Sequence, residues 1–152
     1  MKFSDIEPER WDELKPYVDT VLLPLSGLTG RETPWQATAA LERLRDALDP
    51  IETAYRGRVV TYPALHYAEN ESALARIADE LCERFYDGGF RYCVAVTGDP
   101  ALLTLPLAKA SALVGPEPRD GSTPMETYAS FVRRTIETLW ASGRAGATRS
   151  EL

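Results

Sequence analysis

The sequence is poor in the side chains that bind metals, and it has no long hydrophobic run. It contains one histidine and two cysteines, whereas a catalytic zinc site uses about three protein ligands drawn mostly from His, Asp and Glu. No apolar stretch approaches the ~20 residues that a membrane-spanning helix requires, and the acidic first segment, Met1–Glu7, lacks the apolar stretch of a signal peptide. We therefore expect no metal, no membrane insertion and a cytoplasmic location. In that location Cys82 and Cys93 are expected to be reduced packing residues rather than a disulfide.

Positive charge is also scarce. The 17 Lys and Arg residues are outnumbered by 23 Asp and Glu residues, so the net charge is -6, and the one adjacent basic pair is Arg133–Arg134. Because an acidic surface repels phosphate backbones, we expect no binding to nucleic acids. The rest of the composition, 44% hydrophobic and 26% charged over 152 residues, is typical of one ordinary globular domain.

The sequence does contain three runs rich in apolar and β-branched residues, each followed by a residue that interrupts regular structure. They span residues 17–23 before Pro24, 58–62 before Pro63 and 91–97 before Gly98. Their apolar positions are nearly continuous, which is typical of strands covered on both faces. A weaker run over residues 110–114 is a candidate fourth strand.

Between these runs the apolar residues repeat with the period of a helix. One helix begins with a capping box at Thr33 and Gln36, with a candidate break or kink at Asp49-Pro50 before Gly57 ends it. A second helix is capped by Asn70 and closed by Gly88-Gly89, and a third is expected from Thr123 to Gly143. A short helix around Pro8, with Trp11 and Leu14 facing inward, precedes them all.

Strands that alternate with helices predict a parallel sheet with helices on both faces. The expected fold is a three-layer α/β/α sandwich with a small, mainly parallel four-stranded sheet, Rossmann-like or creatininase-like. We expect one domain over residues 1–142 and a mobile tail over residues 143–152.

Ligands of such sheets bind beyond the carboxyl ends of the strands, where the strand order reverses. Polar and aromatic side chains follow each expected strand there. The candidate ligand-binding residues are Ser26, His66, Tyr67, Glu69 and Asp99, and the loop after the weakest strand adds Glu117.

None of these loops carries a signature of known chemistry. The loop Ser26–Gly30 offers backbone N–H groups to an anion but matches neither G-x-G-x-x-G nor a phosphate loop. Ser26, His66 and Asp99 are the residue types of a catalytic triad, but no G-x-S-x-G surrounds the serine. His66, Glu69 and Asp99 make at best a weak oxygen-rich metal site. We therefore assign no catalytic residue, no metal ligand and no cofactor, and we favour hydrogen-bonded loop roles for these side chains.

Several segments resemble the YpiF-like proteins, an uncharacterised family of Bacillus and related Firmicutes. The segments are residues 17–25, 55–59, 89–92 and 96–99, which fall at matching places over most of the chain. This resemblance implies a lineage and no mechanism.

A more distant resemblance is to the creatininase family of metal-dependent amidohydrolases. It rests on the Leu23-Pro24 step, the segment Tyr62–Tyr67 and the Gly89-Phe90-Arg91 step. Those enzymes are longer, and they place metal-binding residues where this chain has Ser26–Gly30 and Gly98–Pro100. The resemblance therefore implies a reduced, non-catalytic relative without the metal centre.

Three functions stay open from the sequence. The first, which we favour, is a non-catalytic module that acts through a protein partner or a small ligand. The second is an enzyme or ligand sensor, hydrolase-like, that uses the strand-end loops. The third is a structural subunit of a homo-oligomer such as a homo-dimer, since an exposed edge strand invites pairing.

Overall fold

The structure, a computed structural model, describes residues 1–117 and 125–145. Its short 3-10 helices and its α-helices and strands follow one another in this order: η1 (Phe3–Asp5), α1 (Pro8–Leu14), β1 (Thr20–Leu25), α2 (Pro34–Ala54), β2 (Val59–Thr61), α3 (Glu71–Asp87), β3 (Tyr92–Thr97), η2 (Pro100–Thr104), β4 (Ala112–Val114) and α4 (Met125–Ala145). The alternation of strands and helices confirms the predicted α/β fold.

The four strands form one parallel sheet in the order β2-β1-β3-β4. Thr20 of β1 pairs with Val59 of β2 on one side and with Tyr92 of β3 on the other. After β1 the chain therefore forms β2 on one side of that strand and then returns to form β3 on the other side. This reversal places the topological switch point between the carboxyl ends of β1 and β3.

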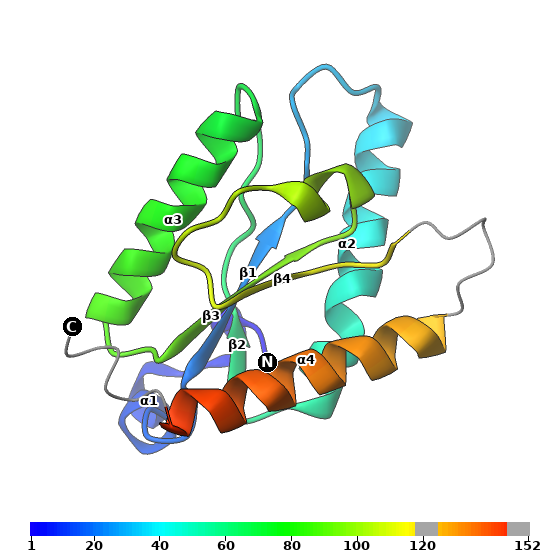
Figure 1. Ribbon diagram of the computed structural model, residues 1–152. Helices are drawn as coiled ribbons and strands as arrows, with labels where there is room; N and C mark the ends of the chain where they lie inside the picture. The colour runs from blue at the N-terminus through cyan, green and yellow to red at the C-terminus, as the bar shows by residue number, and fades with distance from the viewer. Residues whose placement is uncertain (118–124, 146–152) are drawn as a thin grey trace.

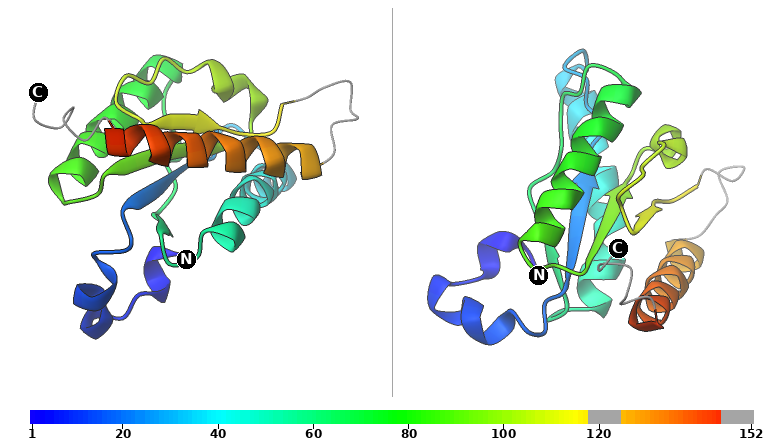
Figure 2. Two further views of the ribbon diagram at one scale, coloured as in Figure 1. Left: turned by 60° about the horizontal axis from the view of Figure 1, so that its bottom comes forward. Right: turned by 60° about the vertical axis from the view of Figure 1, so that its left-hand side comes forward.

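The two faces of the sheet are covered by different helices (Figures 1 and 2). Leu22, Val94 and Val96 pack with residues of α2 and α4 in one buried cluster. The intervening positions, Leu23 and Ala95, pack with α3 and η2 in another. Because neighbouring strand residues point to opposite faces, the nearly continuous apolar runs supply both layers of core at once.

The amino-terminal segment closes the β2 edge of the sheet. The Thr61 N–H donates to the Met1 carbonyl over 2.8 Å, and Lys2 forms a parallel bridge with Thr61. Trp11 and Leu14 of α1 pack against a small third core cluster, as their expected inward orientation predicted.

Helix α4 is held to the sheet through Trp140. Its indole N–H donates to the Thr20 hydroxyl over 3.0 Å, and the Arg58 guanidinium lies 3.7 Å from the centre of its ring. Arg58 also pairs with Asp19 over 3.1 Å. The helix is thus anchored beside the start of β1 and not by apolar contacts alone.

The helix caps predicted at Thr33 and Asn70 are confirmed. Thr33 and Gln36 form a reciprocal capping box, and the Asn70 side chain accepts the Ala73 N–H. Gly89, rather than Gly88, takes the left-handed conformation, with a φ of 106°. The expected Thr123 cap lies outside the described residues.

One proline was assigned wrongly from the sequence, and another interrupts less than it could have. Pro24 was expected to stop the first strand, but it lies inside β1 opposite Val96. Its missing N–H faces the side on which β2 has already ended, so no ladder bond is lost there. Pro50 was a candidate for a break or a kink, and α2 continues through it to Ala54, so the helix does not break there.

The last helix also differs from its expected boundary. It was expected to end at Gly143 but extends to Ala145, and most of the expected tail, residues 146–152, lies outside the described residues. Gly143 lies inside the helix, and its missing side chain makes room for Tyr92: a Cβ there would collide with the Tyr92 ring and hydroxyl. Within the described chain, no helix is both long and apolar enough to cross a membrane.

Candidate functional site

The loops after β1 and β2 run side by side beyond the end of the regular sheet. Leu65 forms a parallel bridge with Leu25, and its N–H donates to the Pro24 carbonyl over 2.9 Å. The Ser26 N–H then donates to the Leu65 carbonyl over 3.2 Å, and the Tyr67 N–H donates to the Leu28 carbonyl over 2.8 Å. These bonds fix the segment that carries His66 against the end of β1.

Ser26 and His66, both expected at strand ends, are in direct contact. The Ser26 hydroxyl lies 2.7 Å from His66 Nδ1 and 3.1 Å from the Leu65 carbonyl, and it accepts the Leu28 N–H over 3.3 Å. Ser26 is only 4% exposed, whereas His66 is exposed. The buried serine therefore fixes the orientation of an imidazole ring that is exposed to solvent.

The hydroxyl of Ser26 has one proton to donate, which leaves two arrangements. If it donates to the Leu65 carbonyl, His66 Nδ1 carries a proton and donates to the serine. If it donates to Nδ1 instead, Nε2 carries the ring proton. In both cases Nε2 is the nitrogen without a partner among the residues that the structure describes. The ring thus presents a single fixed atom, either an acceptor or a donor.

Tyr67 lies beside the histidine in an unusual backbone conformation. Its φ is 62°, the one positive value at a described residue other than glycine. Tyr67 is 66% exposed, and the centres of the His66 and Tyr67 rings are 5.7 Å apart. A bulky residue in the left-handed region is uncommon and marks a place where the surrounding structure imposes the conformation. Two aromatic rings are therefore displayed together on a fixed loop.

Asp99 does not join this pair. Its Oδ1 accepts the Ala101 N–H over 3.0 Å and caps η2, while its Oδ2 lies 2.8 Å from where a Cβ of Gly27 would be. Within the described residues no carboxylate hydrogen-bonds to His66, and the histidine presents Nδ1 rather than Nε2 to the serine. The arrangement is not that of a Ser-His-Asp triad, in which a carboxylate occupies Nδ1.

The glycine-rich loop after β1 already holds an anion, its own Glu32. The Glu32 carboxylate accepts the N–H groups of Thr29 and Gly30 over 2.9–3.1 Å and the Thr29 hydroxyl over 2.9 Å. The Thr29 N–H, with these further bonds, lowers the pKa of Glu32 to about 2. The expected offer of backbone N–H groups to an external anion is therefore met from within the loop at these two positions.

The two remaining candidate carboxylates are both exposed. Glu69 lies on the His66 loop, and Glu117 follows β4. Among the residues described, no three His, Cys, Asp or Glu side chains are grouped closely enough to hold a metal ion. Of the aromatic residues flanking the strands, Tyr92 is buried in the core, whereas Trp35 at the start of α2 is 72% exposed.

The region of the chain that matches a known protein family includes most of this site. A model of a protein family of unknown function, DUF2487, matches residues 9–105, which is more than half of the chain. The chain belongs to the DUF2487 family. No curated protein and no solved structure matches it. The family match names neither the YpiF-like proteins nor the creatininases. Both resemblances therefore stay predictions.

The part of this DUF2487 protein that matches the family contains β1, β2 and β3 with the loops that carry Ser26, His66 and Asp99. Strand β4 and helix α4 follow the matched segment. The switch point and the hydrogen-bonded serine and histidine thus lie within the region that the family model describes.

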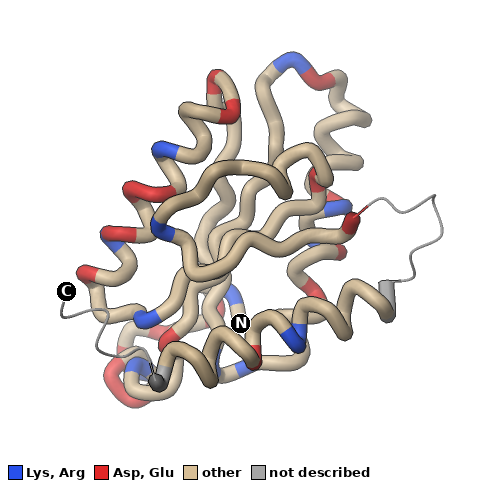
Figure 3. Tube along the Cα trace, viewed as in Figure 1, with Lys and Arg blue, Asp and Glu red and all other residues tan. Residues whose placement is uncertain are grey.

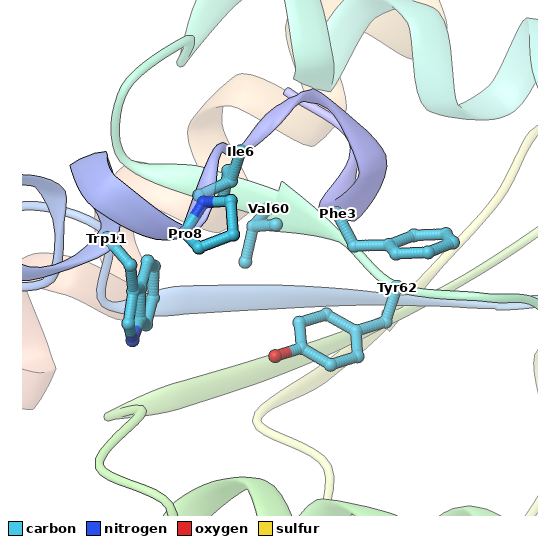
Figure 4. A pocket seen from close by; sticks show the side chains of 6 residues that line it. All are labelled: Phe3, Ile6, Pro8, Trp11, Val60 and Tyr62. Carbon is cyan, nitrogen blue, oxygen red and sulfur yellow. The ribbon is translucent and has the colours of Figure 1, made fainter.

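Two hollows in the surface of the DUF2487 chain lie away from these residues. One hollow, of about 360 Å³, lies between the amino-terminal segment and β2. Figure 4 shows the rings of Trp11 and Phe3 at its two ends, with Val60 and Tyr62 between them. The other, a groove of about 720 Å³ between α2 and α4, is lined by Asp46, Asp49, Pro50, Thr53, Ala54, Ala129 and Arg133. Neither is lined by a strand-end candidate.

Charge does not single out a surface along α3. Figure 3 shows acidic and basic residues mixed on this helix, and they include the pair Arg76 and Glu80 at 3.9 Å. Lys109, from the segment after η2, pairs with Glu83 over 3.3 Å. Such interspersed charge gives no basic stripe for a phosphate backbone on this face, in keeping with the net charge.

Sequence reasoning missed two features of the loops. The left-handed conformation of Tyr67 leaves no signal in the sequence, since tyrosine does not favour it. The Glu32 contact did leave one: a threonine followed three residues later by a carboxylate has the spacing of a capping box, which predicts that the side chain turns back on the loop.

Proposed function

We propose that this protein is a non-catalytic α/β module of the cytoplasm that binds a small polar ligand at the carboxyl edge of its sheet. His66 Nε2 makes the directional contact, and the Tyr67 ring supplies an adjacent apolar surface. The hydrogen bond of 2.7 Å between Ser26 and His66 Nδ1 carries this proposal, because it orients an exposed imidazole that has a free nitrogen.

The position of the pair supports a ligand site. It lies on the loops after β1 and β2, at the carboxyl edge of the sheet where α/β folds bind their ligands. The left-handed Tyr67 is a second indication, since local strain of this kind concentrates at functional loops. A histidine held by a buried second residue is also the arrangement expected where ring orientation matters.

The alternative of a hydrolase-like enzyme is less well supported by the same contacts. A serine nucleophile must be accessible and must give its proton to a base. Ser26 is 4% exposed, and its oxygen already has three partners. We therefore assign the serine a positioning role and the histidine a binding role.

The experiment is a thermal-shift screen of the purified chain against nucleotides, divalent metals and common small metabolites. A ligand at ~100 times its dissociation constant stabilises the folded state by about 2.7 kcal/mol, a rise in Tm of several degrees for a domain of this size. Titration calorimetry then gives the affinity of each compound that raises Tm. We expect His66→Ala to weaken binding about tenfold or more, since one lost hydrogen bond accounts for about 1.4 kcal/mol.

Ser72→Ala is the matched control, because Ser72 is exposed in the first turn of α3 and close in sequence to the loop. It should bind as the unaltered chain does. A ligand that binds His66→Ala with full affinity places the site elsewhere. A screen in which no compound raises Tm contradicts the small-ligand proposal and favours the protein-partner alternative, which affinity purification from the native cell would then address.

A further inference from the structure

Two cysteines from different elements meet in the core. Cys82 on α3 and Cys93 on β3 are both fully buried, and their Sγ atoms are 3.0 Å apart. Both are free thiols in the structure. The separation is shorter than an ordinary van der Waals contact between sulfurs, so the two side chains point directly at each other.

The packing of α3 on the sheet produces this contact. Cys93 points to the same face of β3 as Ala95, toward α3. Cys82 continues the buried stripe of Leu74 and Ala78 along the helix. Because the two sulfurs are held at the ends of short side chains by rigid elements, they remain neighbours as long as α3 stays docked.

The two thiols differ in acidity. The hydrogen bond between the two thiols lowers the pKa of Cys82 below the ordinary value of a thiol. The same hydrogen bond, together with burial, raises the pKa of Cys93. A thiol with a lowered pKa is the better nucleophile toward an oxidant, and a thiol held next to it serves as the resolving partner.

We propose that Cys82 and Cys93 are an oxidation site that forms an intramolecular disulfide when the protein meets a hydroperoxide. The Cys82 thiolate attacks one oxygen of hydrogen peroxide, the O–O bond breaks, and the product is a sulfenic acid with release of one water after protonation. The Cys93 sulfur then attacks the Cys82 sulfur, the S–O bond breaks, and the leaving hydroxide takes the Cys93 proton as a second water. The sulfurs together lose two electrons, which the peroxide gains.

The bond would connect elements that carry the strand-end loops. α3 begins at its Asn70 cap, directly after the His66 loop, and β3 leads into Asp99. Because both sulfurs are buried, the reaction requires transient opening of α3 and is slower than that of an exposed thiol. The oxidised form resists unfolding better, since a cross-link restricts the unfolded chain.

The test treats the purified full chain with hydrogen peroxide, denatures it, blocks free thiols with iodoacetamide and measures the intact mass. We expect a monomer that has lost two hydrogen atoms and gained no alkyl group. Trypsin should release the peptide Ile77–Arg84 joined to Tyr92–Lys109, and dithiothreitol should separate them. The oxidised chain should have a Tm several degrees above that of the reduced chain.

Single substitutions assign the two roles. Cys93→Ser, which keeps a hydrogen-bond donor beside Cys82, should leave a sulfenic acid on Cys82 that dimedone traps, whereas Cys82→Ala should leave Cys93 unreactive. If either variant does not fold, the peptide map of the unaltered chain decides alone. Alkylation of both cysteines after peroxide treatment, a link between two chains, or over-oxidation without a cross-link would each overturn the proposal.

Discussion

At the scale of single residues, a missing side chain decides how closely α2 approaches the sheet. A Cβ on Gly98 would lie 2.5 Å from the carbonyl carbon of Arg43 and 2.7 Å from the backbone nitrogen of Leu44. Both are backbone atoms of α2, which cannot rotate aside as a flexible side chain would. Gly98 also follows β3 at the switch point, so the smallest residue sets the position of the helix there.

We expect Gly98→Ala to lower the free energy of unfolding by about 3 kcal/mol, the upper end of the usual range for overpacking. Gly57→Ala is the control, because Gly57 has a φ of 95° but no atom within 4 Å of its would-be Cβ. Its expected loss is about 1 kcal/mol, from backbone strain alone. Urea denaturation of both variants measures the difference. Equal losses would mean that α2 shifts to accommodate the methyl group.

At the scale of elements, the loop between β1 and α2 should depend on pH through Glu32. The pKa of Glu32 is lowered from 4.5 to about 2 by the N–H groups and hydroxyl that it accepts. A lowered pKa in the folded state means that the stabilisation is present above about pH 4.5 and is lost as the pH falls toward about 2. Below that pH the protonated carboxyl no longer favours the folded loop.

Comparison of the unaltered chain with Glu32→Gln isolates this effect from other carboxylates that titrate in the same range. We expect the difference in stability between the two proteins to be constant near neutral pH and to shrink between about pH 4.5 and 2. Carbon-detected NMR of the Glu32 carboxyl gives its pKa directly. Titration at the ordinary value would show that the loop does not hold the carboxylate in solution.

The elements that the sequence predicted well are those whose ends are decided locally. The Thr33–Gln36 box and the Asn70 cap involve residues within three positions of one another, so the pattern alone identifies them. Pro24 was wrong for a non-local reason: whether a strand tolerates proline depends on which neighbour faces its nitrogen, and β2 ends before that point. A sequence does not show where a neighbouring strand stops.

The candidate site was predictable as a region but not as an arrangement. Because ligands of α/β sheets bind at the carboxyl edge, the sequence predicted that Ser26, His66 and Asp99 lie in one region. Only the structure separates them, because the parallel bridge between Leu25 and Leu65 aligns His66 with Ser26, while Asp99 turns back to cap η2. Such alignments depend on the register between loops, which composition and periodicity do not encode.

At the scale of the whole molecule, the two edges of the sheet bear on the homo-oligomer alternative. An open edge strand offers unpaired N–H and carbonyl groups to a second chain. The β2 edge is already paired in part, since the Thr61 N–H donates to the Met1 carbonyl. The opposite edge, β4, is only three residues long, and short edge strands are a common protection against edge-to-edge pairing.

We therefore expect the chain to be monomeric, with a mass of 16.9 kDa by light scattering that does not change over a wide range of protein concentration. A mass that doubles with protein concentration would restore the structural-subunit hypothesis. Chemical cross-linking followed by mass spectrometry would then show whether the interface lies at the β4 edge or at exposed aromatic residues such as Trp35.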